Sequence, residues 1–221
     1  MGILNGYFES NPGRLIHKWI HYFEVYEAHF ERFRGREVHV VEIGVYYGGS
    51  LQMWKHYFGP QARVYGVDVN PACRRFEEER VRVLVGDQAD RGFLRSLRAE
   101  VPRVDILIDD GGHRMDQQIV TFEELFPHIA EDGVYLCEDL HTSYLPQFGG
   151  GYRRSGTFIE TAKGLVDQLN AWHSREPDAF KVDDFTRSAH SMHFYPGMLV
   201  IEKRPMQMPH ARKTGAPGSG R

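Results

Sequence analysis

The chain has 221 residues, of which 41% are hydrophobic, 26% are charged and 13% are aromatic. This composition argues against a disordered chain and is sufficient for a hydrophobic core that needs no disulfide bridges. The formal net charge is −3, but the first 202 residues carry 22 basic and 30 acidic groups, so nucleic acid is not expected as the main partner.

The sequence has no apolar run of 18 residues, and its first residues lack the basic and apolar regions of a secretion signal. It has two cysteines, too few for a disulfide framework. These features predict a cytoplasmic protein without a membrane span.

The first segment, residues 1–36, is expected to be helical. Between residues 13 and 34 apolar side chains recur at steps of three and four, which predicts one amphipathic helix ending near Gly35. Its aromatic stripe is expected to pack against the core or against a second subunit. Because no acceptor-binding domain is evident in the sequence, we expect a homodimer or higher homo-oligomer in which a second subunit helps to close the pocket, with residues 13–34 at the contact between subunits.

Residues 37–204 alternate between short β-branched runs and stretches of helical character, a pattern typical of a parallel sheet with helices on both faces. A final pair of runs flanks the turn signal Pro196-Gly197, which predicts an antiparallel C-terminal hairpin. The expected fold is therefore α/β, with a Rossmann-like, seven-stranded and mostly parallel sheet. The expected strands are 38–45, 63–69, 81–85, 104–110, 133–138, 189–195 and 198–203, and the expected helices are 50–58, 71–79, 91–99, 115–129 and 157–173.

The end of the chain is rich in proline, glycine and basic residues. From Lys203 onward it contains five basic residues and no acidic one. We expect residues 205–221 to form a flexible basic tail, with contact to an anionic group as the alternative.

Ligands of open parallel sheets bind beyond the carboxyl ends of the strands. The first run ends in E-I-G-V-Y-Y-G-G-S (residues 42–50), where glycines permit a tight turn and a close approach to a ligand. This spacing matches neither G-x-G-x-x-G nor a phosphate loop, so an ordinary strand–helix turn is the alternative. The second run ends in Asp68, which could accept both hydroxyls of a ribose, and Gly86-Asp87 follows the third.

This arrangement resembles the class I S-adenosylmethionine-dependent methyltransferases over about residues 38–204. The resemblance implies that the loop 44–49 lies against the methionine and ribose parts of S-adenosyl-L-methionine. It also implies that Asp68 holds the ribose hydroxyls and that Asp87 and Gln88 lie near the adenine. The candidate cofactor-binding residues are Glu42, Gly44, Tyr46, Gly48, Ser50, Asp68, Asp87, Gln88 and Asp109.

A second group of polar residues follows the fourth and fifth strands, as D-D-G-G-H (109–113) and E-D-L-H-T-S-Y (138–144). If these strands are neighbours, their ends lie about 5 Å apart, and Asp110, Glu138 and Asp139 converge. Crowded carboxylates repel one another unless one is protonated or a cation lies between them. Oxygen donors without cysteine favour Mg²⁺, with Mn²⁺ or Ca²⁺ possible. Helix capping by these acidic residues is the alternative.

The two motifs resemble those of metal-dependent sugar O-methyltransferases of the macrocin and mycinamicin type, which act in antibiotic biosynthesis. The resemblance implies that Asp110, Glu138 and Asp139 bind the metal and that His113 is the general base. His141 is the second candidate for the base, and His141 and Tyr144 are candidate substrate contacts. The implied reaction is Mg²⁺-dependent transfer of a methyl group to a sugar hydroxyl of a glycoside or saccharide, with vicinal hydroxyls chelating the metal.

Two other functions are compatible with these residues. A metal-dependent catechol-type O-methyltransferase would use the same chelation, but a catechol ionises easily and has less need of a histidine base. A non-catalytic, cofactor-binding partner subunit would need the first loop and not the acidic residues. Iron-dependent hydroxylation fits poorly, because it favours two histidines and one carboxylate.

Overall fold

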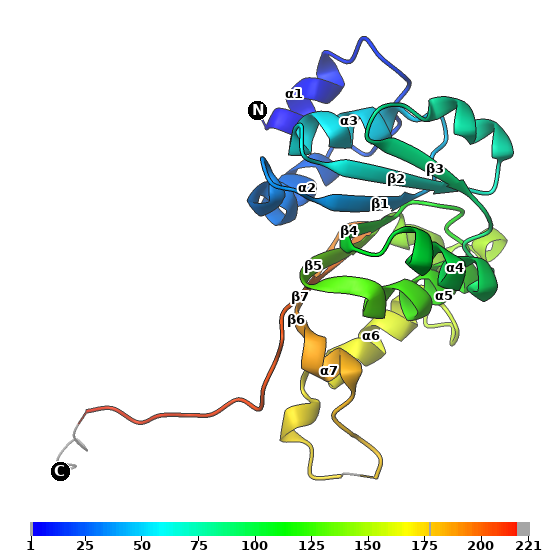
Figure 1. Cartoon of the computed structure of the whole chain (residues 1–221). Helices are drawn as coiled ribbons and strands as arrows, with labels where there is room; N and C mark the ends of the chain where they lie inside the picture. The colour runs from blue at the N-terminus through cyan, green and yellow to red at the C-terminus, as the bar shows by residue number, and fades with distance from the viewer. Residues whose placement is uncertain (1, 177, 216–221) are drawn as a thin grey trace.

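The computed structural model describes residues 2–176 and 178–215. Its centre is a seven-stranded sheet in the order β3-β2-β1-β4-β5-β7-β6 (Figure 1). Strands β1 to β5 are parallel, and β7 is antiparallel to both β5 and β6, which confirms the expected fold and the terminal hairpin. The strands are β1 (His39–Ile43), β2 (Arg63–Asp68), β3 (Val81–Val85), β4 (Val104–Asp109), β5 (Ile129–Cys137), β6 (Ala189–Tyr195) and β7 (Met198–Lys203).

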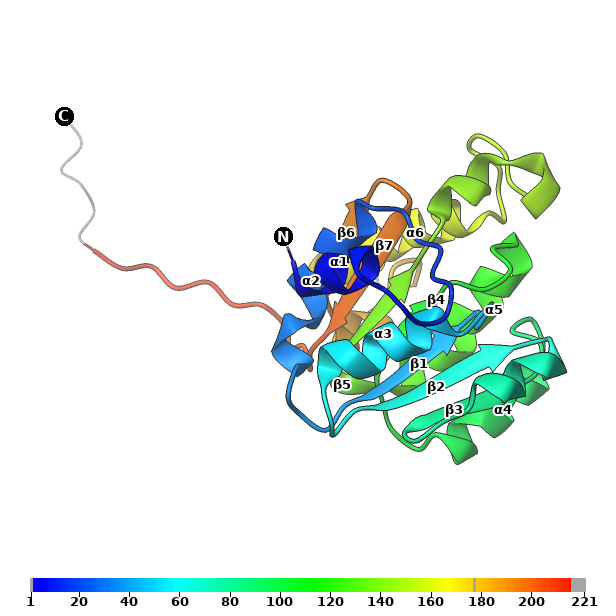
Figure 2. The ribbon, with the colours of Figure 1, turned by 90° about the horizontal axis from the view of Figure 1, so that it is seen from above.

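Helices cover both faces of the sheet (Figures 1 and 2). On one face, α2 (Tyr22–Phe30) and α3 (Gly49–Phe58) bury an aromatic cluster that includes Tyr26 and Trp54. The other face packs against α4 (Arg91–Glu100), α5 (Met115–Leu125) and α6 (Phe158–Leu169). Because β1 and β4 are covered on both sides, these central strands consist almost entirely of buried residues.

Several helices are shorter than expected. The segment 71–79 forms only the 3₁₀ helix Pro71–Phe76, and α5 gives way at Leu125 to a 3₁₀ turn that contains Pro127. The expected helix 157–173 ends as an α-helix at Leu169 and continues as the 3₁₀ turn Ala171–His173. Strand β5 begins at Ile129, earlier than expected, and α7 (Asp184–Ser188) was not anticipated.

The prediction of one helix over residues 13–34 is wrong. The chain forms α1 (Ile3–Glu9), then an irregular segment over residues 10–21, then α2 and the 3₁₀ turn Glu31–Phe33. We call residues 10–21 the strap. The burial of its side chains is set by contacts with the rest of the fold and does not repeat every three or four residues. Leu15, Trp19 and Ile20 are more than half exposed. The aromatic residues of α2 do pack into the core, as expected.

Lys203 is part of β7 and does not belong to the basic tail. Its ammonium donates to the carbonyl oxygens of Phe126 (3.1 Å) and Ile129 (2.6 Å), and its side chain is buried. Residues 205–215 form neither helix nor strand, and residues 216–221 of the expected tail lie outside the described part of the chain. No helix in the described ranges has the length and apolar character needed to cross a membrane.

The buried Lys203 predicts a specific pH dependence of stability. Burial lowers the pKa of Lys203 in the folded protein to about 8. Between pH 8 and the ordinary pKa of a lysine, the unfolded state therefore binds more protons than the folded state. The free energy of unfolding of the wild type is thus expected to rise with pH over this window. This gain is expected to be about 2–3 kcal/mol and to be missing in Lys203→Met. Urea unfolding at pH 8 to 10.5 measures it, with the exposed Lys163→Met as the control. Parallel pH profiles for wild type and Lys203→Met would contradict the prediction.

Candidate active site

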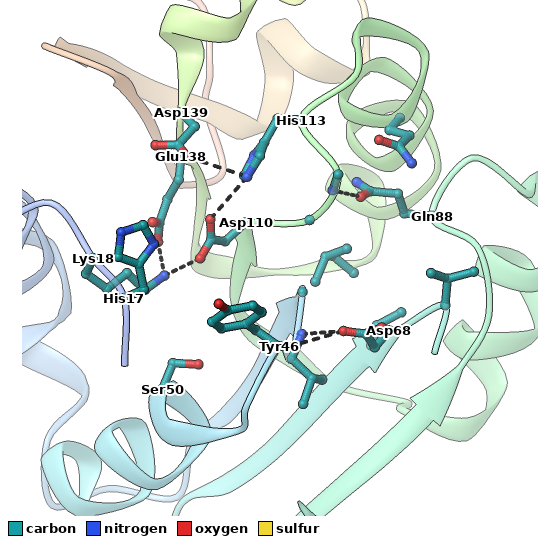
Figure 3. A pocket seen from close by; sticks show the side chains of 18 of the residues that line it. His17, Lys18, Tyr46, Ser50, Asp68, Gln88, Asp110, His113, Glu138 and Asp139 are labelled. Atoms are coloured by element: carbon teal, nitrogen blue, oxygen red, sulfur yellow. Dashed lines mark hydrogen bonds and ion pairs between the residues drawn. The ribbon is translucent and has the colours of Figure 1, made fainter. Parts of the chain in front are cut away.

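A cavity of about 460 Å³ lies beyond the carboxyl ends of the parallel strands, at the edge expected from the sequence (Figure 3). The strap contributes one wall through residues 15–19, which the sequence analysis did not place there. The remaining walls come from the loops that follow β1, β2, β3, β4 and β5. Of the predicted site residues, the cavity is lined by Gly44, Tyr46, Ser50, Asp68, Asp87, Gln88, Asp110, His113, Glu138 and Asp139.

The loop after β1 is held in place by Asp68. One carboxylate oxygen of Asp68 accepts from the backbone amides of Val45 (2.9 Å) and Tyr46 (3.2 Å), and the other accepts from Asn70 (2.8 Å). Gly44 has a φ of +95°, and a Cβ on it would lie 2.0 Å from the carbonyl oxygen of Asp110. The glycine therefore permits both the turn and the close contact with the loop after β4.

Replacing Gly44 by alanine is expected to destabilise the protein by about 2–4 kcal/mol, because the added methyl group meets backbone that cannot move away easily. Chemical denaturation measures the loss. Gly164→Ala is the matched control, since Gly164 lies within α6 with open space around it and should gain up to about 1 kcal/mol. Equal stability of Gly44→Ala and wild type would contradict the close contact.

Three predicted cofactor residues, Glu42, Gly48 and Asp109, are not among the residues that line the cavity. Glu42 is fully buried and accepts from Ser50 Oγ (2.6 Å) and Trp54 Nε1 (3.0 Å). Its carboxylate therefore fastens α3 to β1. Gly48 is the left-handed residue that precedes α3, with a φ of +72°.

Asp109 and Gln88 connect the loops after β3 and β4. Gln88 Nε2 donates to Asp109 Oδ1 (3.0 Å), and Gln88 Oε1 accepts from the backbone amide of Gly112 (2.8 Å). Burial raises the pKa of Asp109 to about 7, although the hydrogen bond from Gln88 opposes the shift. The side chain of Gln88 is thus engaged in shaping the D-D-G-G-H turn.

The carboxylates after β4 and β5 surround Lys18, which the strap inserts between them (Figure 3). Lys18 Nζ lies 2.5 Å from Asp110 Oδ2, 2.8 Å from Glu138 Oε1 and 3.6 Å from Glu42 Oε1, and its side chain is only 3% exposed. Sequence reasoning missed this residue; the available signal was a lysine inside an apolar segment.

The charges of this cluster depend on one another. Burial alone would lower the pKa of Lys18, but Asp110, Glu138 and Glu42 raise it well above its ordinary value, so the ammonium stays charged. Burial and the charge of Asp110 raise the pKa of Glu138 to about 8, although Lys18 and the Tyr26 hydroxyl, 2.7 Å from Glu138 Oε1, both lower it.

His113 faces two of the carboxylates. Its Nε2 lies 3.5 Å from Asp139 Oδ2 and 3.8 Å from Asp110 Oδ1. Ligand atoms of Asp110, His113 and Asp139 lie within 4.8 Å of one another, and Glu138 is not a member of that group. This set of carboxylate oxygens, with one imidazole, fits a hard divalent cation.

The backbone is strained at this cavity. Among the described residues, five non-glycine residues have positive φ angles, and three of them, Tyr46 (52°), His113 (56°) and Asp139 (55°), line the cavity. Such conformations persist only where the surrounding contacts enforce them, and they are concentrated at functional sites. Here they direct His113 and Asp139 toward Asp110.

The two candidate substrate residues lie near the cavity without lining it. His141 Nδ1 is 3.9 Å from Asp139 Oδ1, and its half-exposed ring meets Trp19 edge-on at 6.0 Å between centroids. Tyr144, in the 3₁₀ helix Leu140–Tyr144, is exposed. Their roles stay predictions.

Comparison with known proteins agrees with this geometry. Residues 41–140 match a family described as a methyltransferase domain. The chain is 42% identical over 199 residues to the 8-demethyl-8-alpha-L-rhamnosyl tetracenomycin-C 2'-O-methyltransferase of Streptomyces olivaceus, covering 85% of this chain and 52% of the relative. It is 37% identical over 202 residues to the demethylmacrocin O-methyltransferase of Streptomyces fradiae, covering 86% and 51%.

The fold is also shared with a solved structure of MycE methyltransferase from the mycinamycin biosynthetic pathway, in complex with Mg, SAH and mycinamycin VI. The TM-score is 0.78 at 32% identity, over 91% of this chain and 53% of that one. The chain therefore spans about half the length of these relatives.

The seven-stranded sheet, the loop held by Asp68 and these matches define a class I S-adenosylmethionine-dependent methyltransferase. Within that class, its sequence and fold are similar to those of the macrocin- and mycinamicin-type sugar O-methyltransferases, to which it is closely related. Both assignments confirm the resemblance found in the sequence.

Proposed function

We propose that the protein transfers the methyl group of S-adenosyl-L-methionine to a sugar hydroxyl of a glycoside natural product or saccharide, with Mg²⁺ as the metal. One observation carries this proposal: the loop held by Asp68 and the group Asp110, His113 and Asp139 line the same cavity. The relatives named as O-methyltransferases of rhamnosyl and macrocin compounds support the acceptor class.

The cofactor end of the proposed site is formed by the loops after β1, β2 and β3. The backbone around Gly44 and Tyr46 approaches the methionine and ribose parts, and Asp68 accepts from the ribose hydroxyls. Asp87 and Gln88 lie on the adenine side. In this arrangement the loops after β4 and β5 would be left for the acceptor.

The acceptor end supplies the proton acceptor and the metal ligands. As the sugar oxygen attacks the methyl carbon, a carbon–oxygen bond forms, the carbon–sulfur bond breaks, and His113 takes the hydroxyl proton. Asp110, Asp139 and Glu138 would hold the Mg²⁺, which when bound polarises the acceptor oxygen and stabilises its developing charge. The products are a methyl ether and the demethylated cofactor.

A methylation screen over glycosides, free sugars and catechols, with and without a chelator, tests the proposal. We expect methylated glycosides or saccharides, and loss of the product in chelator. Methylation of catechols alone would establish the catechol-type alternative. Cofactor binding without Mg²⁺ binding and without turnover on any acceptor would establish a binding subunit instead.

We also propose that residues 1–36, 37–204 and 205–221 act as an N-terminal segment, a catalytic domain and a tail, and that the protein is a cytoplasmic homo-oligomer.

Leu15, Trp19 and Ile20 support a subunit contact through the strap, because three large apolar side chains lie exposed close together in the sequence. Light scattering at assay concentration is expected to give at least twice the chain mass, and Trp19→Glu is expected to lower it. A monomeric wild type would contradict this prediction.

A further inference from the structure

The strap and the carboxylates after β4 and β5 are joined by a single side chain. Among the cavity-lining residues of the described chain, Lys18 is the one that bears a permanent positive charge. Its ammonium lies within 3.6 Å of three carboxylates and is almost completely buried. Its ammonium therefore lies between the carboxylates, where a positive charge offsets their mutual repulsion.

The acidic residues of the cavity form two groups: Asp110 and Glu138 contact Lys18, and Asp110 and Asp139 lie near His113. Asp110 directs Oδ2 to Lys18 and Oδ1 toward His113. Glu138 directs Oε1 to both Lys18 and Tyr26. As a result Asp110 and Asp139 gather around His113, while Glu138 is held outside that group.

We propose that Lys18 is a tethered ammonium that competes with a divalent cation for Asp110 and Glu138, so that cation binding releases the strap. This inference rests on the metal site of the proposed function. Two cations that share a pair of carboxylates repel one another. Because coupling between two binding events is reciprocal, the ammonium weakens cation binding by the same factor by which the cation weakens the Lys18 contact.

Release would be confined to the middle of the strap. At one end, Arg14 pairs with Glu78 (3.1 Å) and donates to the carbonyl oxygen of Phe76 (2.9 Å). At the other end, His21 Nε2 lies 3.0 Å from the carbonyl oxygen of Pro196. Between these anchors, residues 15–19 form a wall of the cavity, so release of Lys18 changes access to the acceptor end.

Mn²⁺ alone, without cofactor or acceptor, serves as the probe. Calorimetry is expected to show that Lys18→Met binds Mn²⁺ about tenfold more tightly than wild type, within the 5–150-fold range usual for coupled sites. Lys18→Arg, which keeps the charge, is expected to lack this gain, as is the exposed control Lys163→Met. A merely structural role for Lys18 predicts the opposite, weaker Mn²⁺ binding after Lys18→Met.

Hydrogen exchange of the wild type gives a second readout that needs no variant. Adding Mn²⁺ is expected to speed exchange of the Tyr22 amide, which donates to the carbonyl oxygen of Trp19 in the released segment (3.0 Å), and to leave unchanged the Arg14 amide, which donates to Gln52 Oε1 (3.3 Å). Equal or weaker Mn²⁺ binding by Lys18→Met, or unchanged or slower exchange in the wild type, would overturn the inference. Failure of the proposed function appears separately, as absence of methyl transfer by the metal-loaded wild type.

Discussion

Asparagine in place of His113 is expected to lower kcat by about 10²- to 10⁴-fold and to leave cofactor affinity unchanged. His113 is the imidazole whose Nε2 faces both Asp110 and Asp139 in the cavity. In the proposed mechanism, its removal leaves the acceptor hydroxyl without a proton acceptor. Asparagine is chosen because it tolerates the positive φ of 56° at this position. Steady-state methylation assays and cofactor titrations measure the two quantities.

The control is the same substitution at the second candidate. His141 lies close to Asp139 but outside the cavity lining, so His141→Asn is expected to keep kcat within a few-fold of wild type. Added imidazole should restore part of the activity of His113→Asn if a base has been lost. Full activity of His113→Asn, with loss in His141→Asn, would transfer the role to His141.

Asp110→Asn is expected to lower metal-dependent activity by at least about 100-fold, beyond the 10- to 100-fold loss usual for groups outside the metal ligands. Asp110 offers Oδ1 to the group with His113 and Asp139, and a neutral amide is a poor ligand for a hard cation. The substitution also removes the carboxylate closest to Lys18. Initial rates across a Mg²⁺ titration, with and without chelator, measure the effect.

Asp116→Asn is the matched control, because Asp116 lies in the first turn of α5 near the same loop but is exposed, and it should behave as wild type. Two results would contradict the metal site. One is wild-type activity that persists in chelator, and the other is an Asp110→Asn variant with an unchanged Mg²⁺ dependence.

The strands could be predicted well from the sequence because their signal is local. Periodic β-branched residues placed β3, β6 and β7 with their observed bounds, and Pro196-Gly197 marked the hairpin between the last two. Once the strands are parallel, their carboxyl ends lie at one edge. Asp68, Asp110 and Glu138 could therefore be placed around one cavity without any structure.

The strap could not be predicted in the same way. Leu15, Trp19 and Ile20 share the spacing of the buried α2 residues, so periodicity alone joined them into one helix. What distinguishes the strap is the pairing of Lys18 with residues 92 and 120 positions away. Local pattern holds no information on such contacts. The same limit hid the partners of Lys203, because Phe126 and Ile129 lie on another part of the fold.

By itself, the sequence determined the class of fold, the edge of the sheet that bears the cavity and the acidic residues that follow the strands, because all three follow from periodicity. Only the tertiary structure decided how the carboxylates are divided. An unpaired charge is costly when it is buried. The carboxylate of Glu42 accepts hydrogen bonds from Ser50 and Trp54, and the carboxylate of Glu138 accepts them from Lys18 and Tyr26. The cation between the carboxylates of this structure is thus a lysine of the chain itself, which local pattern could not reveal.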